Sequence, residues 1–213
     1  MKGGTHMPRF RALKNTVRNW IHREDWSADQ PLPPDISPDA APENRQTDPA
    51  SLIGPLFACL PEGSPFTERA AAALGGVLRV LRQERPEEAK NVIRRFMWHM
   101  NEESGNIGWG IPEAFGEALA QSRPLADDFY RVLFSYIRNR EGDNTWCDYA
   151  PLRLSCYRAV ERVVTAWPDL KHEGLCVLHE AQNDPDPTCR ELARDMFERL
   201  RPAPGETARH ILA

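Results

Sequence analysis

Apolar side chains recur every three or four residues along most of the chain after residue 48, in segments separated by proline, glycine and short polar residues. This spacing places apolar groups on one face of an α-helix, and no alternation typical of β-strands extends beyond a few residues. Asp48-Pro49 and Ser64-Pro65 are typical helix starts, because a side-chain oxygen caps the first amides and proline fixes the first helical φ angle. The pattern predicts helices that begin near residues 48, 64, 86, 112, 124, 150, 168 and 188.

Every second predicted helix of this body begins at a regular interval. These helices begin near residues 48, 86, 124 and 168, so the spacings are 38, 38 and 44 residues. A period near 40 residues, built from antiparallel helix pairs, is typical of HEAT and armadillo repeats. Gly116 lies within one predicted helix and is expected to allow close packing. We therefore predict an all-α fold, an α-α superhelix (a HEAT/armadillo-like solenoid) of about four helical hairpins.

Two stretches resemble known repeat proteins at the level of residues. Residues 183–193 (NDPDPTCRELA), followed by Met196, Phe197 and Leu200, resemble the second-helix signature of HEAT-like repeats of the PBS-lyase type. Residues 94–120 resemble a segment of bacterial HEAT-like proteins in which Asn-(Glu/Asp)-Glu-Ser-Gly leads into Gly-Trp-Gly-x-Pro-Glu-Ala, where x is any residue. The resemblance implies a helical-repeat fold and a shared loop, and it implies no catalytic activity.

The first 47 residues differ from the rest of the chain. Residues 1–26 contain an amphipathic basic helix, which we expect to pack on the body of the protein, with docking on a partner as the alternative. Residues 27–47 are rich in proline and are expected to form an extended linker that buries little. The predicted division is completed by a HEAT-like repeat domain over 48–201 and a C-terminal tail over 202–213.

Composition limits the classes of partner. The 213 residues contain 27 Lys and Arg against 31 Asp and Glu, so the net charge of −4 argues against a nucleic-acid partner. No apolar run approaches the ~20 residues that span a bilayer, so no stable membrane insertion is expected. The five cysteines have no paired framework and no metal-binding spacing, which favours a reducing cytoplasm.

The stretch 101–113 interrupts two helical patterns with three glycines, a tryptophan and several carboxylates. Its glycines have the wrong order for a dinucleotide fingerprint, and no phosphate-loop lysine follows, so no cofactor is expected. Trp109 could offer a contact surface to a partner, or Trp109 and Ile111 could fold inward and plug the hairpin end. A second loop, 141–148, carries Trp146. Because equivalent loops of a solenoid share one edge, Trp109 and Trp146 are predicted to share a surface.

The sequence supports a catalytic or metal site less strongly than a contact surface. His99 and Glu103 are one helical turn apart and could form a polar cluster or an acid/base pair, although an ordinary solvated face is the favoured interpretation. The pairs His172-Glu173 and His179-Glu180 are similar to the iron ligands of a HEAT-repeat hydroxylase family. That family distributes its pairs over several repeats, whereas both pairs here lie on one predicted helix, so metal binding is not expected.

These patterns predict a non-catalytic protein-binding or scaffold module. The alternatives are a small-molecule-binding enzyme or accessory factor of the bilin-lyase type, and a metal-binding HEAT-repeat protein. An enclosed pocket lined by His99, Glu102 or Glu103 would favour ligand chemistry, and an open surface would favour a protein partner. The predicted interaction positions are Trp98, Glu102, Glu103, Trp109, Glu113 and Trp146.

Overall fold

The computed structural model describes residues 6–39, 43, 45–101, 107–140 and 144–201 of the chain. Over these ranges the chain forms nine α-helices, and its β pairing is limited to a single bridge between Ser27 and Gln30. The prediction of an all-α fold is confirmed. The elements are α1 (His6–Ile21), α2 (Pro49–Phe57), the 3-10 turn η2 (Leu60–Glu62), α3 (Phe66–Glu84), α4 (Pro86–Met100), α5 (Ile111–Gln121), α6 (Arg123–Ser135), α7 (Ala150–Ala166), the 3-10 turn η3 (Pro168–Leu170), α8 (Lys171–Ala181) and α9 (Pro187–Leu200).

Most helix starts follow the local chemistry that the sequence predicts. The Asp48 carboxylate caps α2 by accepting a hydrogen bond from the Ala50 amide at 3.2 Å. The Asp186 carboxylate accepts bonds from two amides in the first turn of α9, at 3.0 and 2.9 Å. The start of α3 differs, because Pro65 takes the N-cap position and no side chain, Ser64 included, caps the helix.

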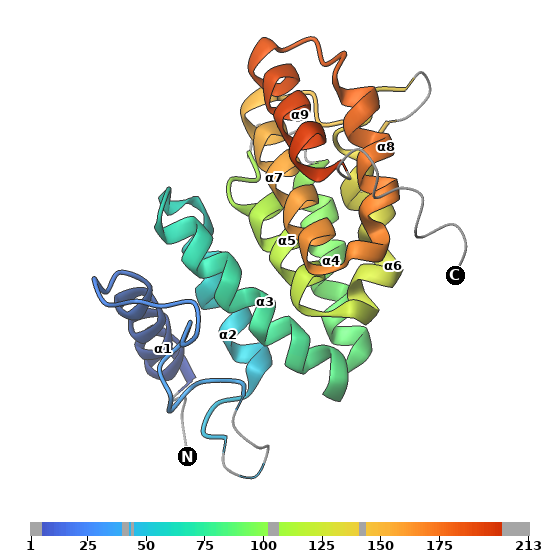
Figure 1. Ribbon diagram of the computed structural model, residues 1–213. Coiled ribbons are helices and arrows are strands. Elements are labelled where there is room, and N and C mark those ends of the chain that lie inside the picture. The colour runs from blue at the N-terminus through green and yellow to red at the C-terminus, as the bar shows by residue number, and fades with distance from the viewer. Residues whose placement is uncertain (1–5, 40–42, 44, 102–106, 141–143, 202–213) are drawn as a thin grey trace, which may run out of the picture.

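The helices pack mostly against neighbouring and near elements of the chain. Helix α5 packs along both α3 and α7, and α7 packs on α9. Helices α2, α4, α6 and α8 pack against members of this row. Figure 1 shows α1 and α2 at one end of the molecule and α8 and α9 at the other. The buried apolar side chains form one cluster that runs from α1 to α9.

Close packing of α5 against α7 depends on Gly116. A Cβ atom at this position would lie 2.8 Å from the Cβ atom and 2.9 Å from the Cα atom of Ala159 on α7, closer than carbon atoms can approach. The prediction that Gly116 allows close packing is confirmed. The two helix backbones can approach only because this residue has no side chain.

We expect the substitution Gly116→Ala to lower the free energy of unfolding by about 1–3 kcal/mol, because the added methyl group must push α5 away from α7. Urea denaturation monitored by circular dichroism measures the change. The control is Gly76→Ala on α3, where the nearest atom would be 3.6 Å away and the loss of backbone freedom in the unfolded chain makes alanine neutral or stabilising. Equal stabilities of the two variants would contradict the expected crowding at Gly116.

The N-terminal helix packs on the body of the same chain. Val17 and Ile21 of α1 have no exposed surface and belong to the main apolar cluster. At the same contact, the Glu62 carboxylate of η2 pairs with Arg18 at 3.1 Å and with His22 at 2.5 Å. Burial of two aliphatic side chains is worth about 1.5–3 kcal/mol each. Apolar packing is therefore the main attachment of α1.

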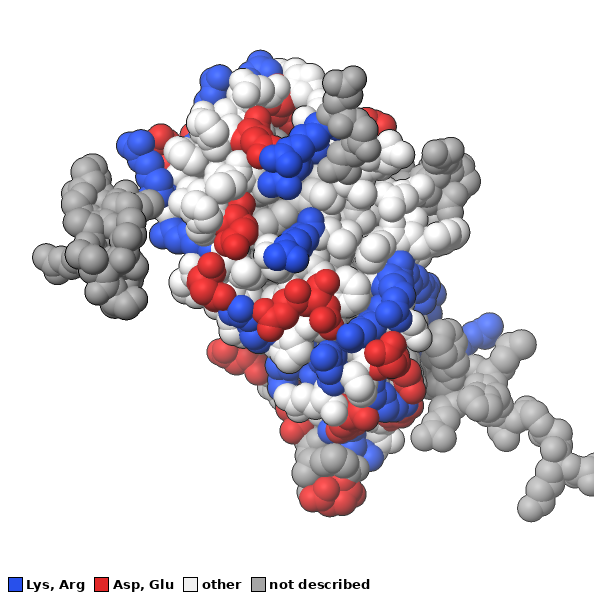
Figure 2. Space-filling view, turned by 90° about the vertical axis from the view of Figure 1, so that its right-hand side faces the viewer, with Lys and Arg blue, Asp and Glu red and all other residues white. Residues whose placement is uncertain are grey.

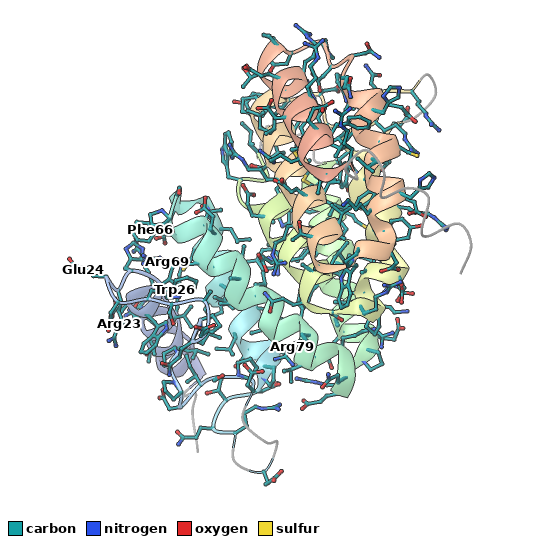
Figure 3. The ribbon with its side chains drawn as sticks, in the orientation of Figure 1. Arg23, Glu24, Trp26, Phe66, Arg69 and Arg79 are labelled. Carbon is teal, nitrogen blue, oxygen red and sulfur yellow. The ribbon has the colours of Figure 1, made fainter. Side chains whose placement is uncertain are left out.

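The segment after α1 is held by one arginine of α3. Nη1 of Arg69 donates to the carbonyl oxygens of Ile21 and Arg23, at 2.8 and 2.7 Å. Figure 3 shows the same side chain among the labelled Trp26 and Phe66, whose ring centroids lie 5.3 and 5.9 Å from its guanidinium carbon. A cation thus occupies the carbonyl end of α1, where the helix dipole favours positive charge.

The Pro-rich segment 27–47 buries more than its composition predicts. Leu32 and Ile36 are almost completely buried and join the main cluster, so the expectation that this segment buries little is wrong for these two positions. The physical reason is that prolines fix the local backbone while the two aliphatic side chains remain free to pack. Arg45 also pairs with Glu84 of α3 at 2.9 Å. The division of the chain at residues 26 and 47 stays a prediction.

Charged side chains are interspersed on the surface. On the face drawn in Figure 2, acidic and basic groups alternate over short distances. Charged side chains on the surface also form ion pairs between helices, such as Arg162 with Glu117 at 2.7 Å and Lys90 with Asp128 at 3.0 Å. Within the described ranges, no helix is both long and apolar enough to cross a membrane.

Candidate functional site

Four large apolar side chains of the described residues are more than a third exposed. Trp98 on α4 is 61% exposed, Ile107 39%, Trp109 42% and Tyr149 46%. They come from the end of α4, the loop that follows it and the residue before α7. We call these four residues the aromatic surface. Single exposed apolar residues are ordinary, but a group of them drawn from neighbouring elements is typical of a contact site.

The loop before α5 is shaped by Gly110. This glycine has a φ angle of +77°, and a Cβ atom on it would lie 2.5 Å from the Leu60 carbonyl oxygen. The close approach fixes the loop against η2 and directs Ile111 inward, where it is 4% exposed. Trp109 remains partly exposed. Of the two side chains that could fold inward and plug the hairpin end, Ile111 is therefore buried and Trp109 is buried only in part.

Trp109 also contacts the loop before α7. Its ring meets Tyr149 edge-on, with centroids 5.8 Å apart. The Trp98 ring contacts that of its chain neighbour His99, with centroids 5.1 Å apart. Such aromatic contacts contribute about 0.5–1.5 kcal/mol beyond simple burial. They hold the exposed rings in fixed positions, which lowers the entropy lost when a partner binds.

Trp109 lines two openings. The larger has a volume of about 340 Å³, and we call it the aromatic groove; its lining includes Phe57, Arg95, His99, Ile107, Trp109 and Ile111. The smaller has a volume of about 170 Å³, and we call it the acidic cleft; its lining includes Leu60, Pro61, Glu68, Trp109 and Glu113. Leu60, Pro61 and Trp109 line both openings, so the two are adjacent.

The aromatic groove is built on stacked side chains of α2 and α4. The Phe57 ring stacks on Phe96 with centroids 5.3 Å apart, and the Arg95 guanidinium lies over Phe57 at 4.1 Å. His99 lies 6.1 Å from the Phe57 ring, centroid to centroid. Arg95 is thus engaged with an aromatic face, and His99 contacts rings on two sides. This open groove offers apolar contact surface with a cation at its edge.

Glu113 lies at the acidic cleft in the first turn of α5. Its Oε1 accepts a hydrogen bond from the Ser155 hydroxyl of α7 at 2.5 Å. Its Oε2 is buried and has no hydrogen-bond partner among the described residues. The side chain therefore joins α5 to α7 and leaves one acceptor unused. The positive end of the α5 dipole favours a carboxylate at this position.

A buried ion pair supports the loop that carries Tyr149. Arg153 of α7 donates from Nε and Nη2 to the two carboxylate oxygens of Asp184, both at 2.8 Å, and both side chains are 1% exposed. Its Nη1 donates to the carbonyl oxygens of Cys147 and Asp148, at 2.6 and 3.0 Å. The same guanidinium lies 4.4 Å from the ring centroid of Trp146. One arginine therefore fixes the backbone just before Tyr149.

The electrostatics of Asp184 follow from these bonds. Burial acts to raise the pKa of this carboxyl. Hydrogen bonds from Arg153, from the Asp186 amide at 2.9 Å and from the Tyr157 hydroxyl at 2.8 Å outweigh burial, so the pKa lies below its usual value. The pKa of Tyr157, whose hydroxyl donates to this carboxylate, is raised, because burial and Asp184 both disfavour its ionised form.

The predicted interaction positions fall into three groups. Trp98 and Trp109 are exposed on the aromatic surface, and Glu113 lies beside it at the acidic cleft. Trp146 is half-buried against Arg153 and belongs to the support of the surface. Glu102 and Glu103 lie outside the described residues, so the pair of His99 with Glu103 does too.

Sequence reasoning missed Tyr149, Ile107 and Ser155. Tyr149 precedes the Ala150-Pro151 helix start, and its position at an exposed helix entrance was an available signal. Ser155 gave none, because a serine inside a helix is equally compatible with solvent or with a buried partner. Its partner Glu113 is 42 residues away in sequence.

The histidine–glutamate pairs of α8 have other partners. Glu180 pairs with Arg138 at 3.2 Å and with Arg140 at 2.5 Å, and the His179 ring lies 5.7 Å from that of Phe197. His172 lies 3.9 Å from the Cys176 sulfur. In the part of the chain that the structure describes, no group of three or more His, Cys, Asp or Glu is placed to hold a metal ion.

Comparison of the chain with protein-family models, with curated proteins and with solved structures finds no match in any of the three. The class defined by the fold is an all-α protein whose described helices pack mostly against neighbouring and near elements. The resemblance of residues 94–120 and 183–200 to HEAT-like repeats remains a sequence-based prediction.

Proposed function

We propose that this chain is a HEAT-like α-solenoid of about four helix pairs that binds a protein partner in the cytoplasm through the aromatic surface. The helix order supports the first part, because α3, α5, α7 and α9 pack in succession while the alternate helices pack against them. The cysteines are free thiols, which is consistent with the reducing compartment that their spacing predicts.

The single observation that carries the binding function is the contact between the exposed rings of Trp109 and Tyr149 beside the aromatic groove, which Ile107 also lines. Tryptophan and tyrosine dominate protein-binding hot spots, because they offer large contact areas with few rotatable bonds. The aromatic groove is open rather than enclosed, and this favours a protein segment over a small molecule. Protein binding is therefore the function that the site supports best.

Affinity capture from the native cytoplasm, with the full chain as bait, tests this function. We expect Trp109→Ala to weaken retention of a specific partner by roughly thirtyfold, since truncation of a hot-spot residue costs about 2 kcal/mol or more. The control is Trp167→Ala. Trp167 follows α7 at the end opposite Tyr149, about 25 Å away for a helix of this length.

Both variants are first compared with the original chain by thermal unfolding, because Trp167 donates a hydrogen bond to the Leu119 carbonyl and its loss affects stability. Retention of the same partner by folded Trp109→Ala at undiminished affinity would argue against the aromatic surface as the binding site.

A further inference from the structure

An opening between α3 and the start of α6 is lined by three arginines. We call it the arginine pocket; its volume is about 320 Å³, and its lining includes Arg79 and Arg82 of α3, Ser122, and Arg123 of α6. The described lining contains no aspartate or glutamate, so the charge of the pocket wall is wholly positive. The arginine pocket is therefore complementary to an anion.

Two helices bring these side chains together. Arg79, labelled in Figure 3, and Arg82 are three positions apart on α3 and so lie on one face of that helix. Helices α3 and α6 both pack on α5, which places the α3 face beside the start of α6. Ser122 is the N-cap of α6 and Arg123 its first residue, where the positive end of the helix dipole also favours an anion.

Arg82 has unused hydrogen-bonding capacity. Its side chain is 24% exposed, and its guanidinium forms no hydrogen bond within the described residues. The ion pair of its Nη2 with Asp128 spans 3.9 Å, beyond hydrogen-bond length, and that carboxylate lies closer to Lys90, at 3.0 Å. A largely buried guanidinium without an acceptor indicates that one arrives with a ligand.

The other two arginines pair with exposed carboxylates outside the pocket lining. Arg79 pairs with Asp39, and Arg123 pairs with Asp127 and Asp169 at 2.7 Å each. These three carboxylate side chains are 53–56% exposed, and such pairs are weak in water. Because each guanidinium has five N–H donors, both arginines can keep these partners and still donate to an anion in the pocket.

Ser122 supplies a second polar group without a partner. The residue is only 5% exposed and lines the pocket, yet its hydroxyl forms no hydrogen bond within the described residues. An N-cap serine normally accepts from the second or third amide of its helix. Here Pro124 occupies the second position and has no N–H, so the hydroxyl stays available. Buried hydroxyls nearly always have a partner, and a ligand oxygen would provide one.

We propose that the arginine pocket binds a phosphate group, held by the guanidinium groups of Arg79, Arg82 and Arg123 and by the Ser122 hydroxyl. Guanidinium donates two parallel bonds to phosphate oxygens, and a phosphate offers more acceptor oxygens than a carboxylate does. The volume lies at the lower end of the ~300–1,000 Å³ of small-molecule sites, so the ligand is a small phosphate monoester or one phosphorylated side chain. This proposal does not depend on the proposed protein-binding function.

Titration of the full chain with inorganic phosphate tests the pocket. The reporter is the indole N–H resonance of Trp167, because the Arg123 guanidinium carbon lies 5.5 Å from that ring centroid. A Trp167→Phe variant assigns the resonance, and sodium chloride keeps the ionic strength constant. We expect a saturable shift with a dissociation constant in the millimolar range. A shift that does not saturate, or no shift at all, would overturn the proposal.

Two variants connect the titration to named residues. Arg82→Gln is expected to weaken phosphate binding about tenfold, because hydrogen bonds from a charged donor are strong. Ser122→Ala is expected to weaken it several-fold without loss of stability, because the hydroxyl has no partner in the folded chain. The matched control is Arg131→Gln, which removes an arginine from the opening between α6 and α8, and no change is expected. Equal weakening by Arg82→Gln and Arg131→Gln would reduce the site to diffuse surface charge.

Two further ligands distinguish the sources of the phosphate group. Free O-phosphoserine and a short peptide with one phosphoserine are titrated in the same way. Equal or weaker binding of the peptide would identify a small phosphate monoester as the ligand, and binding about tenfold tighter or more would identify a phosphorylated protein. Trp109→Ala, altered only at the aromatic surface, is expected to bind phosphate as the original chain does, whatever its effect on partner capture.

Discussion

The substitution Arg153→Met is expected to lower the free energy of unfolding by about 3–5 kcal/mol, the range typical for loss of one member of a buried ion pair. The change leaves the Asp184 carboxylate buried without its cation, and it removes the donor that serves the carbonyl oxygens of Cys147 and Asp148. For a domain whose total stability is about 5–15 kcal/mol, this is a large fraction. Urea denaturation at pH 7 measures it.

A matched surface substitution separates the effect of burial on stability from the effect of losing a positive charge. Arg162→Met removes an arginine from the same helix, where its side chain is 42% exposed and pairs with Glu117 at 2.7 Å. Exposed pairs contribute about 0–1 kcal/mol, so this variant is expected to remain close to the original stability. Similar losses in the two variants would contradict a special role for the buried pair.

Gly110→Ala is expected to lower the free energy of unfolding by about 2–4 kcal/mol. About 1 kcal/mol or more of this comes from a φ angle of +77° that alanine adopts poorly, and about 1–3 kcal/mol comes from overpacking against Leu60. The measurement is again urea denaturation, with Gly76→Ala as the control in which an added methyl group meets ordinary contacts.

The same substitution should also move the indole of the preceding residue, because the loop backbone must shift away from η2 to admit the methyl group. A displaced Trp109 N–H resonance in the NMR spectrum reports that shift. A Gly110→Ala protein with original stability and an unchanged Trp109 resonance would show that the close approach to Leu60 is not required.

Local features of the fold were predictable because they depend on neighbouring residues. Proline marks the helix starts near 48, 86 and 188, and at the first and last of these an aspartate side chain caps amides two or three positions away. The close packing at Gly116 was also accessible, since a glycine among apolar helical positions often marks the close approach of a second helix. Burial of Leu32 and Ile36 was not predictable, because it depends on an apolar cluster that forms only in the folded chain.

The candidate site was predictable only in part, for the same reason. The exposed tryptophans could be named from their loops, but the contact of Trp109 with Tyr149 joins residues 40 positions apart through the packing of α5 on α7. The burial of Arg153 could not be predicted from the sequence, because arginine in a helix is usually solvated. Its partner Asp184 lies in a segment whose composition is typical of an ordinary turn. Sequence periodicity locates helix faces and leaves such pairings open.

The attachment of α1 has a consequence for how the molecule ends. Helices that pack side by side leave apolar surface uncovered at the end of the row unless another segment packs on it. Here Val17, Ile21, Leu32 and Ile36 cover that end, and Arg69 fastens the covering segment through two backbone carbonyls. The N-terminal segment thus adds its own apolar side chains to the main cluster and shields this end of the molecule from solvent.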